Sequence, residues 1–592
     1  MRGTPPRGRV EVAFEDVEED IRRIALLNAV QHGGRALARS VIGKLLAERP
    51  DLKPRAREII PIVQRIVDEV NELPLGEQKR VIEERWPWAL EGEKEEREGG
   101  LPPLPNVEKY GRVVTRFAPN PDCVLHLGSA RAIILSHDYA RMYKGVFYLR
   151  FEDTDPRTKR PRLEFYEAIR EDLRWLNCPW DGEFIQSDRL PVYYEWAEKL
   201  IMKGHAYVCT CGRERFREFA LACKPCPCRG LPTEDHMERW EWMLDGTYSE
   251  GEAVVRVKTD LTHPNPAVRD WPALRIIDTE KHPHPRPEIG SKYRVWPLYN
   301  FACGVDDHLM GITHIIRGKE HITNEIRQRY IYHHLGWEYP ETIHYGRLKI
   351  TGAVLSKSKI VKGVEEGVYE SWDDPRLATL AALRRRGITP EAIRRLMLDV
   401  GPKPVDATLS WENLYAYNRK LVDPEASRYF FVENPWRLVV DGVQEPQTAK
   451  IPLHPDHPER GYRTLHIHPR GDRAELWISE SDGRKAAPGA KFRLIHLFNV
   501  EVLDVDEGAI KARLHSREVE EARRLKLPLI HWVPEDEHVE VEVRRPEGRV
   551  RGLGEANLAK ERVGSIIQLV RYGFGRIDNV EENHVRVYYA HP

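Results

Sequence analysis

The segment from residue 113 to residue 149 constrains the fold of this chain most. A short apolar run, Val113–Phe117, is typical of a strand, and the turn Ala118-Pro-Asn-Pro121 follows it. A helix is expected over 129–143, closed by Lys144 and then Gly145, and a second apolar strand begins at Val146. A strand, a crossover helix and a second strand form the repeating unit of a parallel sheet. The sequence therefore predicts an α/β, Rossmann-type domain.

The rest of the chain divides into further parts by its apolar spacing. Helical spacing runs from about 15 to 90 and includes Ile59, Val63, Ile66, Val67 and Val70, while Thr389 and Pro390 predict the cap and the first residue of a later helix. A Gly- and Pro-rich linker ends at Pro105, and period-two alternation begins near 428. A chain of 592 residues is long enough for about four domains. The expected parts are a helical N-terminal extension with its linker (1–105), the first half of the Rossmann domain (106–205), an insertion (206–270), its second half (271–365), a helical connector (366–427) and a β-barrel region (428–592).

Composition narrows the class of protein without naming it. The chain is 41% hydrophobic and 31% charged, which excludes a largely disordered protein. Its 92 Lys and Arg balance 93 Asp and Glu, so any surface that binds nucleic acid must be local. No apolar run approaches the ~20 residues that span a bilayer, and the polar start has no signal-peptide core. We therefore expect a cytoplasmic protein.

Five of the eight cysteines lie between Cys209 and Cys228, which suggests a metal site rather than a disulfide framework. Two Cys-x-Cys pairs, Cys209/Cys211 and Cys226/Cys228, offer the four thiolates of a tetrahedral structural zinc site. Cys223 is a rival ligand, because Cys223-x-x-Cys226 is also a valid spacing. Reduced, unliganded thiols are the alternative.

Two short motifs indicate phosphate chemistry. His126-Leu-Gly128-Ser129 opens the helix after the first strand, where free N–H groups favour an anion. His126 can donate a hydrogen bond to phosphate, and Gly128 lets a flat base approach the backbone. Ser356 and Lys357 lie in a hydroxyl- and lysine-rich loop that can neutralise a pyrophosphate leaving group. Either motif alone is weak, since solvated loops contain the same residues.

The two motifs together resemble the signatures of class I aminoacyl-tRNA synthetases. Two further stretches, Arg150-Phe-Glu-Asp-Thr-Asp155 and the run from Pro297 to His321, are similar to glutamyl-tRNA synthetases. The resemblance runs from about Asn106 to the C-terminus. The helical N-terminus and the β-rich tail resemble the archaeal form of this family.

The resemblance implies ATP-dependent ligation of glutamate to tRNA(Glu) through a glutamyl-adenylate, with ATP bound as its Mg²⁺ complex. It implies that His126 and Lys357 are catalytic. It also implies that the insertion binds the acceptor end, the helices at 375–401 the inner elbow and the barrels the anticodon of tRNA. The residues that would bind ATP are His126, Gly128, Ser129, Ser356 and Lys357.

The amino-acid pocket is assigned by the same resemblance. Arg116 and Arg317 would hold the side-chain carboxylate of the substrate, Tyr299 would close the pocket, and Glu152 would bind the α-ammonium group. The residues alone also fit a capping role for Glu152 and a core position for Tyr299. Zinc in the insertion resembles the metal site of some relatives.

Three positions depart from the family pattern. Ser129 stands where many relatives have a second histidine, so a hydroxyl would contact phosphate there. Cys123 stands where relatives usually have glycine, which questions the turn geometry. Val354 replaces the first lysine of the loop, which makes Lys357 the better candidate for the catalytic lysine.

Other functions fit parts of the pattern. Glutaminyl-tRNA synthetase is the nearest alternative, and a nucleotidyltransferase or a non-catalytic tRNA-binding module are more distant ones. Relatives of archaeal type often charge both glutamate and glutamine tRNAs with glutamate, so the resemblance predicts tRNA(Gln) as a second partner. One interpretation of the N-terminal helices is a protein-docking module. The arginines at 384–386 and 394–395 fit either helix-end solvation or contact with tRNA phosphates.

Overall fold

The computed structural model describes residues 14–31, 34–49, 52, 55–86, 100–352 and 356–592. The chain forms two compact units, 1–102 and 103–592, and each is described by itself. Most of the expected linker and Val354 fall outside the described residues. Within those residues, no helix has the length and apolar character needed to cross a membrane.

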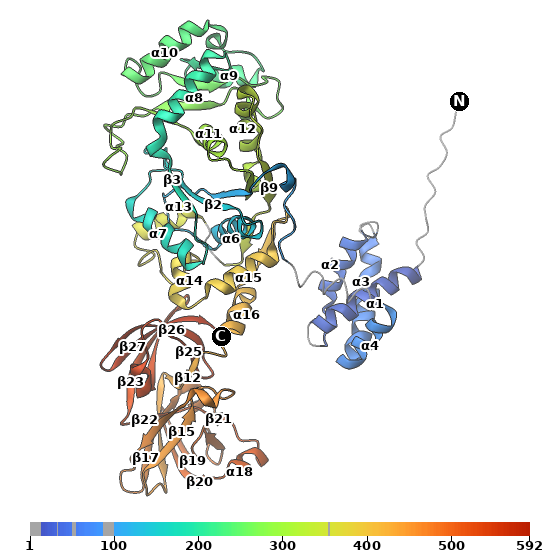
Figure 1. The fold of residues 1–592 in the computed structure, drawn as a ribbon. Coiled ribbons are helices and arrows are strands. Elements are labelled where there is room, and N and C mark those ends of the chain that lie inside the picture. Colours follow the sequence, from blue (N-terminus) through green and yellow to red (C-terminus); the bar gives the residue numbers. More distant parts are fainter. Residues whose placement is uncertain (1–13, 32–33, 50–51, 53–54, 87–99, 353–355) are drawn as a thin grey trace. The chain divides into compact units, whose positions relative to one another are not determined.

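The first unit is helical, as predicted. The apolar face predicted for the third helix is buried at every position, Ile59, Val63, Ile66, Val67 and Val70, because residues three and four apart lie on one face. This face packs against the first helix. The helices are α1 (Phe14–Gln31), α2 (Ala38–Glu48), α3 (Ala56–Glu72) and α4 (Leu75–Arg85) (Figure 1).

The second unit contains the predicted parallel sheet. β1 (Val114–Phe117), β2 (Val146–Phe151) and β3 (Gly182–Ile185) pair in parallel, and α6 (Leu127–Met142) is the crossover helix. β8 (His314–Gly318) and β9 (Glu341–Tyr345) are also parallel. The amide of Thr313, just before β8, donates to the carbonyl of Val114 at 3.0 Å, which links β8 to β1. The strand order therefore changes direction between β1 and β8, where such folds bind their ligands.

The end of α6 differs from the sequence-based expectation in one detail. Gly145 was expected to close the helix, but Lys144 takes the left-handed conformation with φ of 52°. Gly145 serves a different purpose, because a Cβ there would lie 2.1 Å from the carbonyl oxygen of Val113. The glycine therefore permits the chain to enter β2 close to β1.

The insertion is built on an antiparallel sheet that extends beyond its expected boundary. β4 (Ala206–Cys209), β5 (Val254–Val257), β6 (Pro272–Ile276) and β7 (Val295–Pro297) pair in that order. The boundary expected at residue 270 falls inside this sheet, because β5 pairs with β6 through Val255 and Leu274. The helices of this part are α8 (Leu190–Met202), α9 (Arg213–Leu221) and α10 (Thr233–Asp245).

Further helices belong to the part with the parallel sheet and to the connector. The predicted start of one of them is confirmed, because the hydroxyl of Thr389 accepts a hydrogen bond from the amide of Ala392 and Pro390 occupies the first turn. They are α7 (Leu163–Trp175), α11 (Tyr299–Leu309), α12 (Ile322–Leu335), α13 (Lys357–Glu365), α14 (Leu380–Arg386), α15 (Pro390–Val400) and α16 (Trp411–Val422). β10 (Leu348–Ile350) and β11 (Ala407–Leu409) form a parallel pair beside them.

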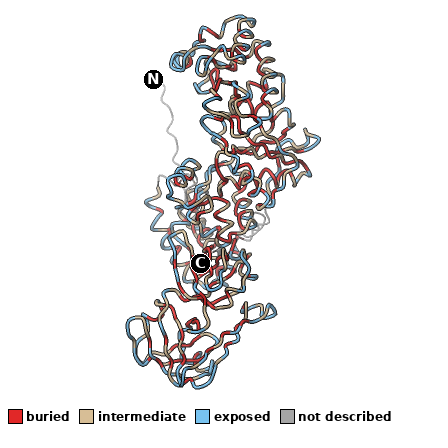
Figure 2. Tube along the Cα trace, turned by 90° about the vertical axis from the view of Figure 1, so that its left-hand side faces the viewer, coloured by how far each residue is buried: buried red, intermediate tan, exposed pale blue. Residues whose placement is uncertain are grey.

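The C-terminal part is the predicted β region, with two barrel-like seven-stranded sheets. Buried positions alternate along its strands, and Figure 2 shows buried residues throughout both sheets. One sheet has the order β12 (Ser427–Tyr429), β25 (Ile566–Leu569), β26 (Gly573–Glu581), β27 (His584–His591), β23 (His538–Arg545), β24 (Gly548–Glu555) and β13 (Phe431–Glu433). The other has the order β21 (Leu529–Ile530), β18 (Lys491–Leu494), β19 (Asn499–Asp506), β20 (Ala509–Ser516), β14 (Pro435–Asp441), β17 (Arg473–Ser479) and β22 (Val533–Pro534). A separate hairpin joins β15 (Gln447–Pro452) to β16 (Tyr462–Ile467).

Candidate active site

A cavity of about 720 Å³ lies at the C-terminal ends of β1 and β2, where the parallel sheet changes direction. It gathers six of the residues that the sequence singled out: His126, Gly128, Ser129, Glu152, Tyr299 and Lys357. Arg116, Arg317 and Ser356 are not among its lining residues. The two signature motifs, far apart in the sequence, therefore meet at one site.

His126 precedes the first turn of α6 and is held in the neutral form. Burial lowers the pKa of His126 to about 4, and the nearby charge of Lys357 acts in the same direction. Its buried Nδ1 has no hydrogen-bond partner in the described part of the chain. A neutral imidazole in this position can donate one N–H to a ligand oxygen.

Gly128 is required by the histidine beside it. A Cβ at this position would lie 2.9 Å from Cε1 of His126. The sequence suggested that this glycine admits a flat base, whereas the structure shows the imidazole ring against it. The amide of Ser129 donates to the carbonyl of His126 at 2.7 Å, which closes the turn.

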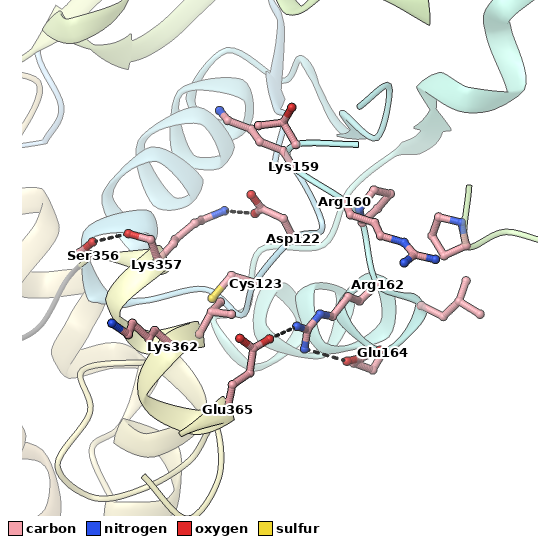
Figure 3. Close-up of a pocket in the computed structure, with 16 residues that line it drawn as sticks. Asp122, Cys123, Lys159, Arg160, Arg162, Glu164, Ser356, Lys357, Lys362 and Glu365 are labelled. Atoms are coloured by element: carbon pink, nitrogen blue, oxygen red, sulfur yellow. Dashed lines mark hydrogen bonds and ion pairs between the residues drawn. The ribbon is translucent and has the colours of Figure 1, made fainter. Parts of the chain in front are cut away.

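Lys357 connects the second motif to the first. It is the first residue of α13, and its Nζ donates to Oδ1 of Asp122 at 3.0 Å and to the carbonyl of Asn120 at 3.4 Å (Figure 3). Both partners belong to the loop after β1. Ser356 is exposed and lines a neighbouring cavity instead, with its hydroxyl 3.1 Å from that of Ser358.

The turn between β1 and the first motif accommodates Cys123 without a left-handed backbone conformation. Cys123 is not among the residues with positive φ, and its side chain is buried against Val124 and Phe165. The glycine usual in relatives is therefore not needed here for a left-handed conformation.

Arg116 belongs to a buried network of two arginines and two carboxylates. Its Nε donates to Oδ1 of Asp307 at 3.1 Å, and Arg150 donates to the same oxygen at 2.8 Å. Arg150 also donates to Oε1 of Glu152 at 3.1 Å. Although burial opposes ionisation, the charges of Arg116 and Arg150 lower the pKa of Asp307 to about 2. The sequence analysis did not assign Arg150 and Asp307 to the site, because their pairing joins strands to a helix far away in sequence.

Glu152 lines the cavity and is not a simple cap. Its Oε1 accepts a second hydrogen bond from Sγ of Cys303, one turn along α11 from Tyr299, at 2.8 Å. Burial raises the pKa of Glu152, and the charge of Arg150 opposes this rise. The sequence did not single out Cys303.

Tyr299 and Arg317 contact further polar side chains outside this network. The Tyr299 hydroxyl lies 3.4 Å from Nδ1 of His321. Burial raises the pKa of Tyr299, Cys303 and Glu152 act in the same direction, and the charges of Arg317 and Arg116 oppose this rise. Arg317 lies on β8, is 5% exposed, and donates to Gln328 and Tyr339. Its Nε has no partner within the described residues.

The cavity is also lined by residues to which the sequence gave no role. Asn120, Asn300 and His321 belong to stretches quoted above, and the others carried no local signal. These lining residues include Asn120, Gln186, Arg275, Asn300, His321, Asn324, Arg327 and Tyr345.

The four cysteines of the two Cys-x-Cys pairs form one cluster in the insertion. Their sulfur atoms all lie within 4.8 Å of one another, with 3.9 Å between Cys209 and Cys226 and between Cys211 and Cys228. The sulfur atoms around a tetrahedral zinc with bonds of ~2.3 Å are ~3.8 Å apart, so the donor set fits this metal. Cys223 is exposed and lies outside the cluster, so the structure does not support it as a rival ligand.

The arginines at 384–386 and 394–395 were predicted either to be solvated at helix ends or to contact tRNA phosphates. Most of them bind groups of the protein. Arg385 pairs with Asp578, Arg386 donates to the carbonyls of Tyr589 and Ala590, and Arg394 donates to Leu176. Arg385 and Arg386 therefore join α14 to the C-terminal sheet, and they are not available as a row of phosphate contacts.

Comparisons with known proteins define the class. The family described as "tRNA synthetases class I (E and Q), catalytic domain" matches residues 112–424. Two families described as anti-codon binding domains of the same synthetases match residues 426–517 and 529–578. With the parallel sheet and its cavity, these matches define a class I aminoacyl-tRNA synthetase of the glutamyl and glutaminyl group.

Full-length relatives narrow this class. A glutamate–tRNA ligase of Pyrococcus furiosus is 56% identical over 583 residues, which cover 97% of this chain and 100% of that protein. A glutamate–tRNA ligase of Thermococcus kodakarensis is 55% identical, with 98% of this chain and 100% of that protein covered. The chain belongs to the glutamate–tRNA ligase family. The resemblance to the archaeal form is thus confirmed, and the glutaminyl alternative is not favoured.

Proposed function

We propose that this chain activates glutamate with ATP and transfers it to tRNA in the 720 Å³ cavity. The observation that supports this most is the meeting of His126, Lys357 and Glu152 around one space. A neutral hydrogen-bond donor and a lysine suit the phosphates of ATP, and a carboxylate suits an ammonium group.

The nucleotide lies between His126, Gly128, Ser129 and the Lys357 loop in this proposal. Mg²⁺, which enters with ATP, neutralises phosphate charge. An oxygen of the α-carboxylate of glutamate attacks the α-phosphorus, and the bond from this phosphorus to the oxygen bridging to the β-phosphorus breaks. Pyrophosphate leaves with that oxygen and its electron pair, and glutamyl-adenylate remains. No proton transfer is needed, because the attacking carboxylate is already ionised, so positioning and charge neutralisation supply the catalysis.

Arg116 and Arg317 select the glutamate side chain in this proposal. Arg317 is nearly buried with an unpartnered Nε in the described part of the chain, and its planar fork suits a carboxylate. Tyr299 closes this end of the pocket. Glu152 binds the α-ammonium group, and Arg150 and Cys303 fix its orientation.

The other parts of the chain bind tRNA in this proposal. The insertion guides the acceptor end, the helices at 375–401 contact the elbow, and the β region binds the anticodon. The terminal 2′-hydroxyl attacks the carbonyl carbon of the adenylate, AMP leaves with the phosphate oxygen, and the hydroxyl proton is released. Both tRNA(Glu) and tRNA(Gln) are substrates, and the cysteine cluster holds a structural Zn²⁺.

ATP–pyrophosphate exchange tests this function. The exchange is measured with each amino acid, with and without tRNA. We expect exchange with glutamate and background rates with glutamine. Exchange with glutamine and not with glutamate would identify a glutaminyl enzyme. Binding of tRNA without exchange under any condition would identify a binding module.

A further inference from the structure

A second cavity, of about 910 Å³, adjoins the proposed active site (Figure 3). Lys159 and Lys357 line both cavities, so these two side chains form part of the wall between them. His126 lines only the first cavity. The cations of the second are Lys159, Arg160, Arg162, Lys357 and Lys362, and its carboxylates are Asp122, Glu164 and Glu365.

The walls of this cavity are held by hydrogen bonds between two loops. The loop after β2 donates from the amide of Glu152 to Pro119 and from the amide of Arg162 to Pro121, both at 2.9 Å. The side-chain amide of Asn120 donates to the carbonyl of Lys159 at 3.4 Å. Because these bonds fix the backbone on both sides of Lys159 and Arg160, the two side chains start from defined positions.

The carboxylates of the cavity are already committed to other cations. Asp122 accepts from Lys357, and Glu365 and Glu164 pair with Arg162 (Figure 3). Lys159 and Arg160 are exposed and have no ion-pair partner within the described residues. The cavity therefore keeps two unneutralised cations, and its chemistry fits a compact polyanion.

We propose that this cavity receives the pyrophosphate formed in the activation step before it leaves the protein. This inference rests on the proposed function, which produces pyrophosphate beside Lys357. Lys159 and Arg160 would take over the charge that Lys357 neutralises first, and thereby draw the product away from the adenylate.

The test replaces both cations in the full chain, as Lys159→Gln with Arg160→Gln. The KM for pyrophosphate in glutamate-dependent exchange should rise about tenfold, since the two lost contacts from exposed cations are together worth about one order of magnitude in affinity. The KM for ATP is compared in Arg160→Gln alone and should stay within about twofold, because Arg160 lines only the second cavity and ATP binds in the first. Lys203→Gln with Lys420→Gln removes the same charge from exposed lysines outside both cavities and should change neither constant.

Three results would overturn the inference. They are an unchanged KM for pyrophosphate, an equal rise in the KM for ATP, and a rise confined to the KM for tRNA. Calorimetric titration of magnesium pyrophosphate into the wild-type and variant chains measures the same site without turnover, and equal affinities there would also contradict it. Glutamate-dependent exchange by the wild-type chain is measured separately. Its absence would contradict the proposed function, whereas normal exchange in the wild type with an unchanged KM for pyrophosphate in the variants would contradict only this site. The single variants repeat the measurement if the double variant does not fold.

Discussion

Lys357 shows at the residue scale how a single cation links the two signature motifs. In the structure its ammonium group is held by Asp122 and the Asn120 carbonyl, and it lies at the wall shared by both cavities. A phosphate oxygen can replace the oxygens of Asp122 and Asn120, because it accepts hydrogen bonds from the same N–H groups of Lys357. The charge is therefore available where the leaving group develops.

Replacement of Lys357 by alanine should slow adenylate formation far more than it weakens glutamate binding. The lysine charge matters most as pyrophosphate leaves, so the loss belongs to the transition state. Single-turnover adenylate formation and glutamate binding are measured on the same variant. Lys357→Arg is the control that keeps the charge. Equal losses in rate and binding would contradict the assignment.

Arg317→Gln should lose most glutamate activation and narrow the preference for glutamate over glutamine. The guanidinium of Arg317 is 5% exposed, and glutamine would present an NH2 group to this donor. Leaving such a buried charge unpaired costs ~3–5 kcal/mol, which is enough for large discrimination in rate. The measurement is kcat/KM for both amino acids with tRNA present. If both rates fall together and their ratio stays near that of the wild type, Arg317 supports the fold and does not select the substrate.

The pH dependence of the site should carry no titration of His126 near its ordinary pKa. Since its folded pKa is about 4 and the unfolded value is ~6.5, the unfolded chain binds this proton first. The contribution of His126 to stability is therefore present above pH ~6.5 and is lost as the pH falls towards 4. This contribution is measured as the unfolding free energy of the wild-type chain minus that of His126→Asn, between pH 4 and 8. We expect this value to decrease as the pH falls, and an increase would contradict the lowered pKa of His126.

At the scale of elements, local patterns predicted those features that one helix or one strand determines alone. The buried face of α3, the parallel pairing of β1 with β2 and the cap at Thr389 follow from spacing within a few turns. The continuation of the insertion sheet beyond 270 was missed, because β6 pairs with a strand that precedes it by many residues. The network of Arg116, Arg150 and Asp307 was missed for the same reason.

The insertion should carry about one zinc per chain. Cys209→Ser and Cys226→Ser should each lose the metal, because every ligand of a tetrahedral site is needed for tight binding. Cys223→Ser is the matched control, since its side chain lies outside the cluster, and should keep the metal. Metal analysis of protein prepared without chelators is the measurement. Wild-type protein without zinc would refute the site.

At the scale of the whole molecule, the second unit joins the cavity to the surfaces proposed for tRNA. Arg385 and Arg386 connect α14 to the C-terminal sheet, and Arg394 connects α15 to the loop before β3. The nearly equal numbers of acidic and basic residues do not reveal these connections, because each of these arginines binds a group that lies far away in the sequence. The role of the first unit as a docking module remains a prediction.

Charging of purified tRNA transcripts measures the proposed reaction from end to end. Labelled glutamate and labelled glutamine are each supplied with ATP and with tRNA(Glu) or tRNA(Gln). We expect glutamate on tRNA(Glu), glutamate also on tRNA(Gln), and glutamine on neither. Undetectable glutamate on tRNA(Gln) beside robust charging of tRNA(Glu) would show that the enzyme charges tRNA(Glu) only. Glutamine on tRNA(Gln), with no glutamate on tRNA(Glu), would contradict the proposed function.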